Sequence, residues 1–518
     1  METRPFTPPA PPSSNGNGNG NGHANPGDLR EHLNYYSQRD NDRETTRYLS
    51  AATQISADYA RAVVARVVHE PYRALAPAHG ADVTVVARWA LDSLRRIARR
   101  DAVLTITLIA GIFFSIVFGA VIQASAWLVL ATVLIMFALA FFCIAYEYWV
   151  RWYEILAGQM LREAFDPAAA PQPASERVSK RLQAAADRKN GNLVVFAGQS
   201  AFSGSGNKLA QEQIVIDVSA AKEEAAKEED DDSSSEPSPF TITDLHVAIA
   251  KAIKNLDLPG LNVMERVFVN GRHVRGNAQL QRHPLEPPFA SVTDDLLHGA
   301  AEHPTADART YVCAEIHGWQ GQLVVTMFAR AVHTGGWLYI EYSFYLLPPI
   351  NAVYTRVDSL YDESMGLRLR KVWAFSAART VPCLLKSPFS LARQQARARG
   401  WSARESVQGY LIHRGQSFDY GAMRSIREEA CKGGSRHYFI QRDITMYLLL
   451  LQKSLLREVE NFLADHNIGT ADFHAQAKVI IDASYKNYSV HIGNVSDSTV
   501  AVGDKAKASG GGDKSSAD

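Results

Sequence analysis

Cysteine is scarce in this chain: there are four among 518 residues, and none lies in a Cys-x-x-Cys pair. The sequence therefore predicts neither a zinc site nor a disulfide framework, and it favours a reducing compartment. Net charge is also absent, because 54 basic residues balance 54 acidic ones, so the mean charge says little about partners.

Recognisable catalytic motifs are missing as well. There is no Gly-x-Ser-x-Gly nucleophile elbow and no His-Glu-x-x-His motif, and the sixteen histidines are scattered. The glycine-rich stretch 198–208 does not end as a phosphate-binding loop does, because Leu209 follows Lys208, and we interpret it as a hairpin loop. We expect no catalytic residue, no metal and no cofactor, although a site assembled in space from distant residues is not visible in a sequence.

Charge is missing from two long apolar runs, residues 102–122 and 125–146. As helices they would each be roughly 30 Å long, which matches the hydrocarbon core of a bilayer. Buried core helices are the alternative, but two adjacent uncharged runs of this length favour membrane spans. The connection between them is so short that we expect a transmembrane hairpin within residues 101–150.

The flanking charges predict how this hairpin is oriented. Arginines precede the first run and follow the second, whereas the turn holds none. The positive-inside rule then predicts a multi-pass protein of the inner membrane with both termini in the cytoplasm. The flanking arginines are Arg88, Arg95, Arg96, Arg99, Arg100, Arg151 and Arg162.

Small residues recur inside both runs, every four positions in the first and every seven in the second. Small side chains let helix backbones approach closely in lipid. The two stripes either face each other within one hairpin or mediate oligomerisation. The residues predicted to pack in this way are Gly111, Ser115, Gly119, Ala131 and Ala138.

Composition divides the rest of the chain. Strand patterns with turn residues between them occur near 310–317, 322–332 and 336–347, and Asn270-Gly271 is a further hairpin signal. The predicted fold class is α+β: the transmembrane hairpin, a cytoplasmic domain of antiparallel β-meander plus helices, and a helical C-terminal part. The predicted segments are a disordered tail (1–28), juxtamembrane helices (29–100), a linker (165–190), the α+β domain (190–350) with an acidic disordered insertion (220–239), a basic and helical region (351–485), and a strand-repeat tail that ends in disorder (486–518).

Residues 364–404 hold nine arginines or lysines and no acidic residue. Such a segment near a membrane would be held to anionic inner-leaflet lipids. Solubility, or pairing with the acidic insertion, is an alternative; nucleic acid is a third that we do not expect, because no recognisable nucleic-acid-binding module surrounds the segment. The predicted membrane-surface residues are Arg368, Arg370, Lys371, Arg393, Arg397 and Arg399. The helix predicted next, over 442–469, is a core helix or a self-association helix.

Two matched segments, 490–494 and 500–504, share the pattern Val-x-(Ile/Val)-Gly-(Asn/Asp). Alternating β-branched residues with low charge favour strands that can stack between chains. Packing on their own domain or on a partner, or a disordered tail, are the alternatives. The residues predicted to take part in assembly are Val490, Ile492, Gly493, Val500, Val502 and Gly503.

Two resemblances accompany these patterns. The two spans, together with "NLVVFAGQSAFSGSG" and "YVCAEIHGWQGQLVVTMFARAVHTGGWLYIEYSFYLLPP", resemble a group of uncharacterised bacterial two-pass integral membrane proteins, over most of residues 80–480. The tail repeats are similar to the RIP homotypic interaction motif and its bacterial amyloid-signalling relatives. The first resemblance implies a membrane location without an activity, and the second implies self-association.

We therefore expect a non-enzymatic, membrane-anchored cytoplasmic scaffold, sensor or signalling adaptor. Its expected partners are the lipid bilayer, anionic inner-leaflet lipids, and other proteins or further copies of itself. One alternative is a membrane-perturbing effector that is triggered by self-assembly of the tail. An enzyme with an unrecognised active site is the other.

Overall fold

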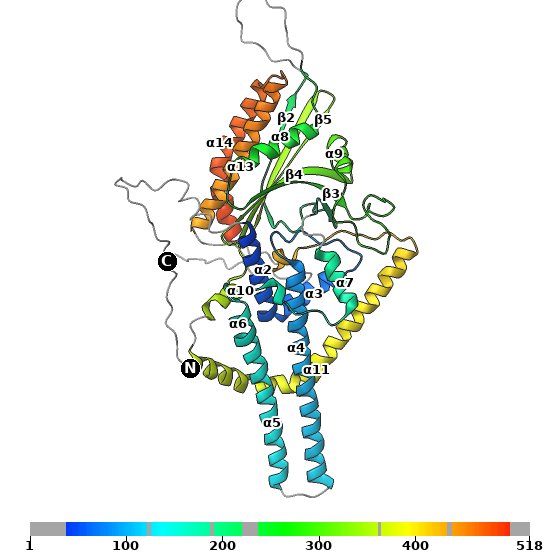
Figure 1. The fold of residues 1–518 in the computed structure, drawn as a ribbon, viewed down its shortest axis with the longest axis vertical. Helices are drawn as coiled ribbons and strands as arrows, with labels where there is room; N and C mark the ends of the chain where they lie inside the picture. Colours follow the sequence, from blue (N-terminus) through cyan, green and yellow to red (C-terminus); the bar gives the residue numbers. More distant parts are fainter. Residues whose placement is uncertain are drawn as a thin grey trace, which may run out of the picture.

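The computed structural model describes residues 38–121, 126–186, 191–219, 237–360, 364–431 and 438–497. A six-stranded sheet and its helices form one end of the molecule, and two long helices project from the other (Figure 1). The predicted α+β class is confirmed at this level. The tail 1–28 and most of the acidic insertion lie outside the described residues.

The described elements follow one another along the chain as a helical part, a mixed part and a second helical part. The helices are α2 (Gln38–Ile55), α3 (Ala57–Val67), α4 (Val83–Ile116) with η1 (Val117–Val121), α5 (Ala126–Trp149) with η2 (Val150–Leu156), α6 (Ala157–Gln159), η3 (Pro167–Ala169), α7 (Glu176–Ala186), α8 (Ile242–Lys254), α9 (Asp294–Glu302), α10 (Ala352–Thr355), η4 (Arg356–Leu360), α11 (Met365–His413), α12 (Ile426–Ala430), α13 (Tyr438–Asp465) and α14 (Ala471–Asp497). The strands are β1 (Leu193–Phe196), β2 (Asn207–Asp217), β3 (Leu261–Asn270), β4 (Ala308–Gly318), β5 (Leu323–Thr334) and β6 (Trp337–Leu347).

The sheet has the order β1-β3-β4-β5-β6-β2. Strands β3 to β6 form an antiparallel meander, β2 pairs antiparallel with β6, and β1 is parallel to β3. The three strands predicted between 310 and 347 are confirmed as β4, β5 and β6. Apolar and polar residues alternate most clearly in β6, whereas β4 and most of β5 are buried on both faces.

Two predicted hairpins are wrong. The loop 198–208 joins β1 and β2, which lie at opposite edges of the sheet and do not pair. After Asn270 the chain passes through α9 before it reaches β4, so Asn270-Gly271 is not a hairpin turn. A Cβ atom at Gly271 would lie 2.1 Å from the backbone nitrogen of Gly421, so glycine is required there for close approach of two backbones.

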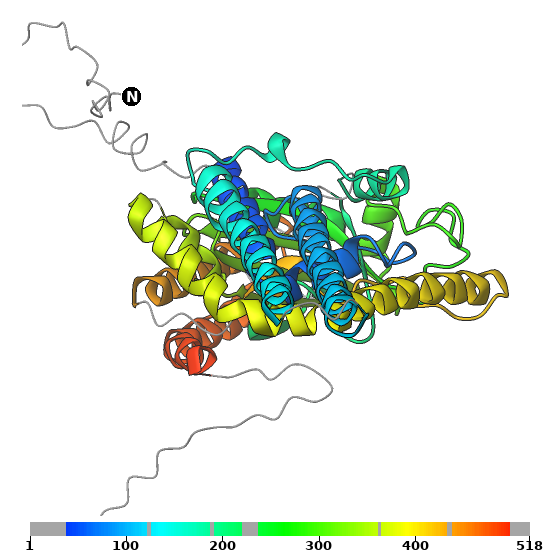
Figure 2. The ribbon, with the colours of Figure 1, turned by 90° about the horizontal axis from the view of Figure 1, so that it is seen from below.

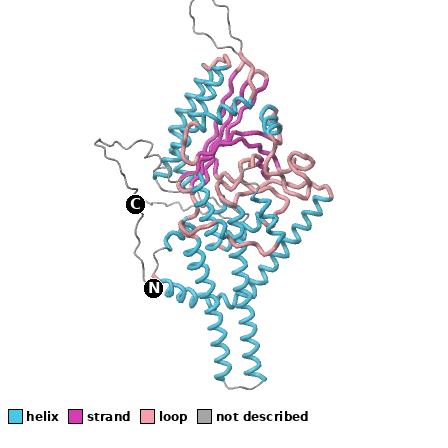
Figure 3. Tube along the Cα trace, viewed as in Figure 1, coloured by secondary structure: helices cyan, strands magenta, loops and turns pink. Residues whose placement is uncertain are grey.

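The core of the sheet is completed by helices from distant parts of the chain. Helices α8, α13 and α14 cover one face, where Leu448 and Leu455 pack with Ile340 and Phe344 (Figure 3). The apolar stripe predicted within 442–469 is therefore part of the core, and α13 is the core helix that was one of the two alternatives for this segment. On the other face Phe202 stacks on Phe328, with 4.1 Å between ring centroids, so the loop 198–208 is packed against the sheet.

The last helix corrects the predicted strand over 490–494. Helix α14 continues to Asp497, so the backbone of Val490, Ile492 and Gly493 is helical. Its first turns pack on the core through the fully buried Phe473, and once a helix is nucleated each further residue adds to it at low cost. Val500, Val502 and Gly503 lie outside the described residues, and a role of the tail in assembly stays a prediction.

Helices α4 and α5 lie side by side and extend beyond the rest of the molecule (Figures 1 and 2). Both are long and apolar enough to cross a membrane. A core helix of a soluble protein would be mostly buried, but only 17% and 11% of their most apolar windows are buried. Ile106, Phe113 and Phe142 are 60–67% exposed. A contiguous apolar surface of this kind marks contact with a membrane or with another protein.

Only the first of the two small-residue stripes faces the neighbouring helix. A Cβ atom at Gly111 would lie 2.4 Å from Met136 Sδ on α5, and one at Gly119 would lie 3.8 Å from Val129. Ser115 is half-buried and donates a hydrogen bond to the Gly111 carbonyl. Ala131 and Ala138 are exposed, so the expectation that both stripes face each other is wrong for α5. Larger α5 residues fill the space that the glycines leave.

Candidate functional site: a basic cavity at the base of the apolar helices

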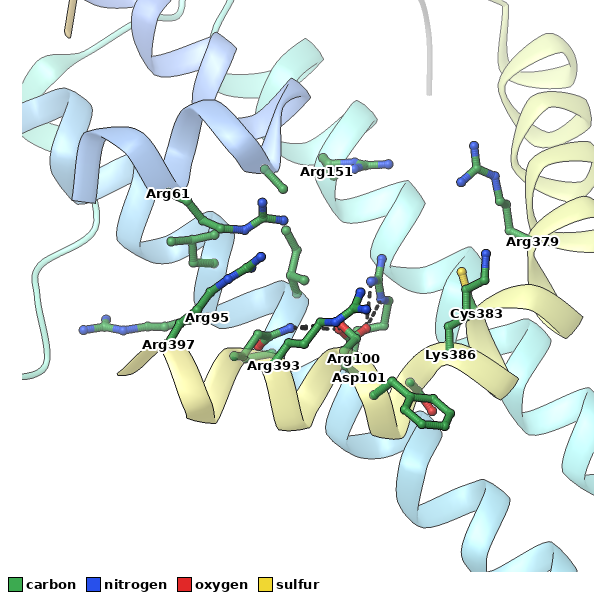
Figure 4. Close-up of a pocket in the computed structure, with 18 of the residues that line it drawn as sticks. Arg61, Arg95, Arg100, Asp101, Arg151, Arg379, Cys383, Lys386, Arg393 and Arg397 are labelled. Atoms are coloured by element: carbon green, nitrogen blue, oxygen red, sulfur yellow. Dashed lines mark hydrogen bonds and ion pairs between the residues drawn. The ribbon is translucent and has the colours of Figure 1, made fainter. Parts of the chain in front are cut away.

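A cavity of about 1150 Å³ lies where α4 and α5 join the rest of the molecule (Figure 4). It lies between the end of α2, α3, α4, the η2 segment that follows α5, and α11. Among the described residues, eight cationic side chains and one acidic side chain, Asp101, line it. The cations are Arg61, Arg95, Arg100, Arg151, Arg379, Lys386, Arg393 and Arg397.

Local sequence fixes the α4 side of this cavity. Asp82 caps α4 by accepting hydrogen bonds from the backbone N–H groups of Thr84 and Val85. The helix then runs without proline or glycine until Gly111. Arg95, Arg100 and Asp101 are therefore held on one rigid element, immediately before the uncharged run begins.

Asp101 fastens α4 to α11. Its side chain is buried, and Arg100 Nη2 donates to Asp101 Oδ1 over 2.7 Å. The other oxygen accepts from Ser390 Oγ at 2.5 Å and from Gln394 Nε2 at 2.9 Å. Hydrogen bonds to a charged acceptor are the stronger kind, so we expect this contact to fix the position of α11.

A second carboxylate balances the cations nearest the apolar runs. Glu147 on α5 is buried, with Oε2 at 3.7 Å from Arg100 Nη1 and Oε1 at 3.8 Å from Arg151 Nε. Glu147 and Asp101 each supply one negative charge, and these two charges balance Arg100 and Arg151. These four residues lie at the same level of the two helices, where the uncharged runs meet the charged part of the chain.

The remaining cations are not balanced in this way. Arg61 pairs with Asp58 outside the cavity. Within the part of the chain that the structure describes, no ion pair to an acidic residue is found for the other five, which are Arg95, Arg379, Lys386, Arg393 and Arg397. Figure 4 shows Arg379 and Lys386 extending from α11 on the side of Arg151. The cavity therefore carries an excess of about five positive charges.

Helix α11 supplies half of these cations and spans 49 residues. It crosses the base of α4 and α5 and then turns away along the side of the molecule (Figure 1). Pro382 and Pro388 lie inside it, and a proline removes a backbone hydrogen bond and permits a bend. One row of buried residues forms the contact with α4 and α5, and Leu384 of this row packs with Leu104 and Ala140. The row consists of Val372, Ser376, Thr380 and Leu384.

An exposed apolar row follows the contact row at a constant offset. It consists of Met365, Leu369, Trp373, Val381, Leu385 and Phe389, which are 44–70% exposed. Trp373, Val381 and Leu385 each follow a contact-row residue by one position, which on a helix is about 100° or a quarter turn. Phe389 continues the four-residue spacing of the apolar row. Arg379 and Cys383 precede contact-row residues, so the cavity occupies the opposite flank of α11.

Two aromatic contacts show which way the apolar row faces. The Trp373 ring lies 4.9 Å from the ring of Phe141, inside the uncharged run of α5. The Phe375 ring lies 4.4 Å from the ring of Tyr148, seven residues later and about 10 Å further along α5. The exposed apolar row therefore faces the free ends of α4 and α5, and the cationic flank faces the rest of the molecule.

The far end of the cavity is closed by an aromatic contact between α11 and the end of α3. Trp401 stacks on the imidazole of His69, with 4.0 Å between ring centroids. Burial and the positive charge of Arg181 lower the pKa of His69 below its usual range. The ring is thus neutral at physiological pH and contributes apolar surface beside the cations.

The structure brings together only some of the predicted surface residues. Arg393 and Arg397 line the cavity, whereas Arg370, Lys371 and Arg399 are exposed elsewhere on α11. Arg368 lies over the Tyr153 ring at 5.4 Å. No pattern in the sequence indicated that the basic run meets the arginines flanking the apolar helices. Four-residue spacing of apolar residues within the basic run is the signal that could have separated its two flanks.

A second group of charged side chains lies on β3 and β4, on the sheet side of the molecule. Glu315 is buried and pairs with Arg266, and one of its oxygens is 3.5 Å from both His79 Nδ1 and His317 Nε2. Burial opposes ionisation of Glu315, but the charge of Arg266 and the two imidazoles hold its pKa well below the usual range. A cavity of about 150 Å³ adjoins these residues.

This group has the residue types and the order of contacts of a hydrolase triad, but its serine is buried. Ser205 Oγ is 3.4 Å from His79 Nε2, on the side away from Glu315. The carboxylate is already engaged by Arg266, and Ser205 is buried and does not line the adjoining cavity. The group joins the segment between α3 and α4 to the sheet. The described residues contain no cluster of three metal-binding side chains, and the absence of catalysis stays a prediction.

Taken together, fold and cavity define a mixed α+β protein with two helices able to cross a membrane and an anion-attracting cavity at their base. The family of AbeC-like domains matches residues 211–497, more than half of the chain, and the chain belongs to this family. The matched range begins in β2 and ends with α14, so it includes α11 but not α3, α4 or α5. No curated protein and no solved structure matches the chain.

Proposed function

We propose that this protein is a two-pass membrane protein of the inner membrane whose cytoplasmic part is a non-catalytic scaffold or sensor held against the inner leaflet. The observation that carries the proposal is the change of surface at one level of the molecule. Below Arg100, Asp101, Glu147 and Arg151, the paired helices α4 and α5 expose apolar side chains; above them lies the charged and folded remainder.

The position of α11 supports the same proposal. Its apolar row faces the free ends of α4 and α5, and its cations lie on the opposite flank. A helix with this division lies in the plane of a membrane interface, with the apolar face toward the acyl chains and the cations at headgroup level. Three helices would then meet the bilayer: two that cross it and one that lies on it.

The charge distribution supports a cytoplasmic location of the sheet. The arginines are on the same side of the bilayer as the sheet, and the positive-inside rule assigns that side to the cytoplasm. A scaffold or sensor is favoured because the described residues offer a basic cavity and a broad folded surface. The effector alternative relied on strands in the tail; 490–494 is helical, and 500–504 lies outside the described residues.

A topology experiment tests the proposal. A reporter that is active only outside the cytoplasm should give signal when fused at residue 124. It should give none at residue 518 or when inserted at Gly335, an exposed glycine between β5 and β6. The reverse pattern, or no signal at any position, would contradict the proposed topology.

Charge insertion into the spans provides a second readout. Ile109→Arg and Leu134→Arg change exposed side chains in the middle of the apolar runs, and an arginine there opposes insertion by about 2.5–3.5 kcal/mol. The double variant should leave the membrane fraction. Val215→Arg, at an exposed position on strand β2, is the control and should remain in it.

A further inference from the structure

We propose that the basic cavity at the base of α4 and α5 binds the phosphate-bearing headgroup of an anionic phospholipid. The inference rests on the proposed membrane location, which places the cavity at headgroup level. It assigns a ligand class to a site that the AbeC-like family match leaves without one.

The unbalanced charge of the cavity requires an anion. Asp101 is saturated by Arg100, Ser390 and Gln394, and Glu147 serves Arg100 and Arg151. The five other lining cations have no such partner within the described residues. Like charges gathered around one volume repel one another, and an anion that enters this volume removes the repulsion. Arginine is well suited to phosphate, because its planar fork donates two parallel hydrogen bonds to neighbouring oxygens.

The cavity also has an apolar part. Leu91, Leu94, Ile97 and Phe389 line it together with the cations. At about 1150 Å³ it is as large as the largest small-molecule sites, and too large for a single inorganic phosphate to fill. A molecule that is charged at one end and apolar at the other fits this lining better than a small free anion does.

The path into the cavity favours a lipid as that molecule. Phe389 belongs to the exposed apolar row of α11 and also lines the cavity. This row faces the free ends of α4 and α5, where acyl chains would lie. At Phe389 the membrane-facing flank and the cationic flank of α11 therefore meet, close to the prolines where the helix can bend. A lipid could keep its chains on the membrane side of α11 while its phosphate reaches the arginines.

A titration of the full chain in detergent tests the inference. The probes are dioctanoyl-phosphatidylglycerol, dioctanoyl-phosphatidylcholine and inorganic phosphate, and the readout is the rise in unfolding midpoint that binding produces. Phosphatidylglycerol should raise the midpoint at concentrations where phosphatidylcholine does not. Inorganic phosphate should match it only at far higher concentration, because it lacks the apolar end.

A pair of charge-matched variants locates the effect. Arg393→Gln with Arg397→Gln removes two cavity cations, and the affinity for phosphatidylglycerol should fall about thirty-fold, from roughly a five-fold loss for each cation at a membrane surface. Arg399→Gln with Arg404→Gln removes two exposed cations from the same helix outside the cavity. This control should keep the wild-type affinity within about two-fold.

The outcomes separate the two proposals. Each variant is first tested for membrane integration, so failure of the topology is seen before lipid is added. If an integrated protein binds phosphatidylglycerol and phosphatidylcholine equally, the headgroup inference is overturned. Equal losses in the two double variants would also overturn it, because they would indicate general surface attraction. If inorganic phosphate alone binds as tightly as phosphatidylglycerol, the site is one for a free anion and not for a lipid.

Discussion

The molecule gathers charged side chains in two places, and the two are balanced in opposite ways. Beside the sheet, Glu315 pairs with Arg266 and with the imidazoles of His79 and His317, all of them buried. At the base of the apolar helices, Asp101 and Glu147 face eight cations, several of which are exposed. A balanced, buried group holds a fold together, whereas an unbalanced, accessible one attracts something that the chain does not supply. The comparison predicts opposite responses to similar substitutions.

The largest effect is expected at the balanced group. Glu315→Gln leaves the Arg266 cation buried without a counter-charge, and breaking a buried pair from one side costs about 3–5 kcal/mol. The free energy of unfolding in detergent, from denaturant titration, should fall by this amount. Glu176→Gln makes the same change in an exposed pair with Lys180 and should have little effect. Similar values for both variants would show that the Glu315 group is not structural.

The second-largest loss of stability is expected for Asp101, the acidic residue that lines the cavity. Asp101→Asn weakens the hydrogen bonds that join α4 to α11 through Arg100, Ser390 and Gln394. We expect a loss of about 1.5–3 kcal/mol in the free energy of unfolding. The variant also makes the cavity more positive, so it should bind phosphatidylglycerol at least as tightly as wild type. A loss of both stability and lipid binding would mean that Asp101 is needed for the site itself.

Lowering the pH should remove the stabilisation from the Glu315 group gradually, whereas Glu315→Gln removes it at once. The pKa of Glu315 in the folded protein lies well below its ordinary value of 4.5. Its contribution to stability is therefore complete above pH 4.5 and is lost as the pH falls from there through the folded pKa. Unfolding midpoints measured across this range should approach those of Glu315→Gln as the pH falls. A gap that stays constant down to the lowest pH would contradict ionisation as the source of stability.

The smallest effect is expected for single cavity cations. Without anionic lipid, Arg393→Gln removes a repelling charge and no ion pair, so the free energy of unfolding should change by no more than about 0.5 kcal/mol. Arg266→Gln changes the same residue type in the balanced group and should cost several times more. The measurement is a denaturant titration of both variants in lipid-free detergent. Comparable losses would remove the distinction between the two groups.

Sequence patterns predicted the features that depend on local periodicity. The strands β4 to β6, the uncharged helices and the buried stripe of α13 follow from the spacing of apolar residues. The predicted hairpin turns were wrong where contacts between distant residues determine the conformation. Glycine is required at position 271 because the backbone of Gly421 approaches it, and β1 pairs with β3 and not with β2, the next strand along the chain. The 490–494 segment reads as a strand, yet continuation of a packed helix prevails there.

The residues of the candidate site come from parts of the chain that are far apart in the sequence. Arg95 and Arg393 line one cavity although almost 300 positions separate them, and His79 reaches Glu315 from a segment more than 200 positions away. A single sequence predicted that the 364–404 segment is basic, but not that its cations divide between a cavity and an open surface. Only the packing of α11 across α4 and α5 makes that division.

Photo-crosslinking can show directly whether a lipid occupies the basic cavity. A photo-crosslinking phenylalanine analogue at Phe389 keeps the ring and places the reactive group where the apolar row meets the cavity. The same analogue at Tyr410, an exposed aromatic residue near the C-terminal end of α11, is the control. After irradiation in native membranes, mass spectrometry should find anionic phospholipid joined to position 389 and none at 410. Absence of a lipid adduct at 389, or equal adducts at both positions, would contradict a lipid headgroup site at the base of the apolar helices.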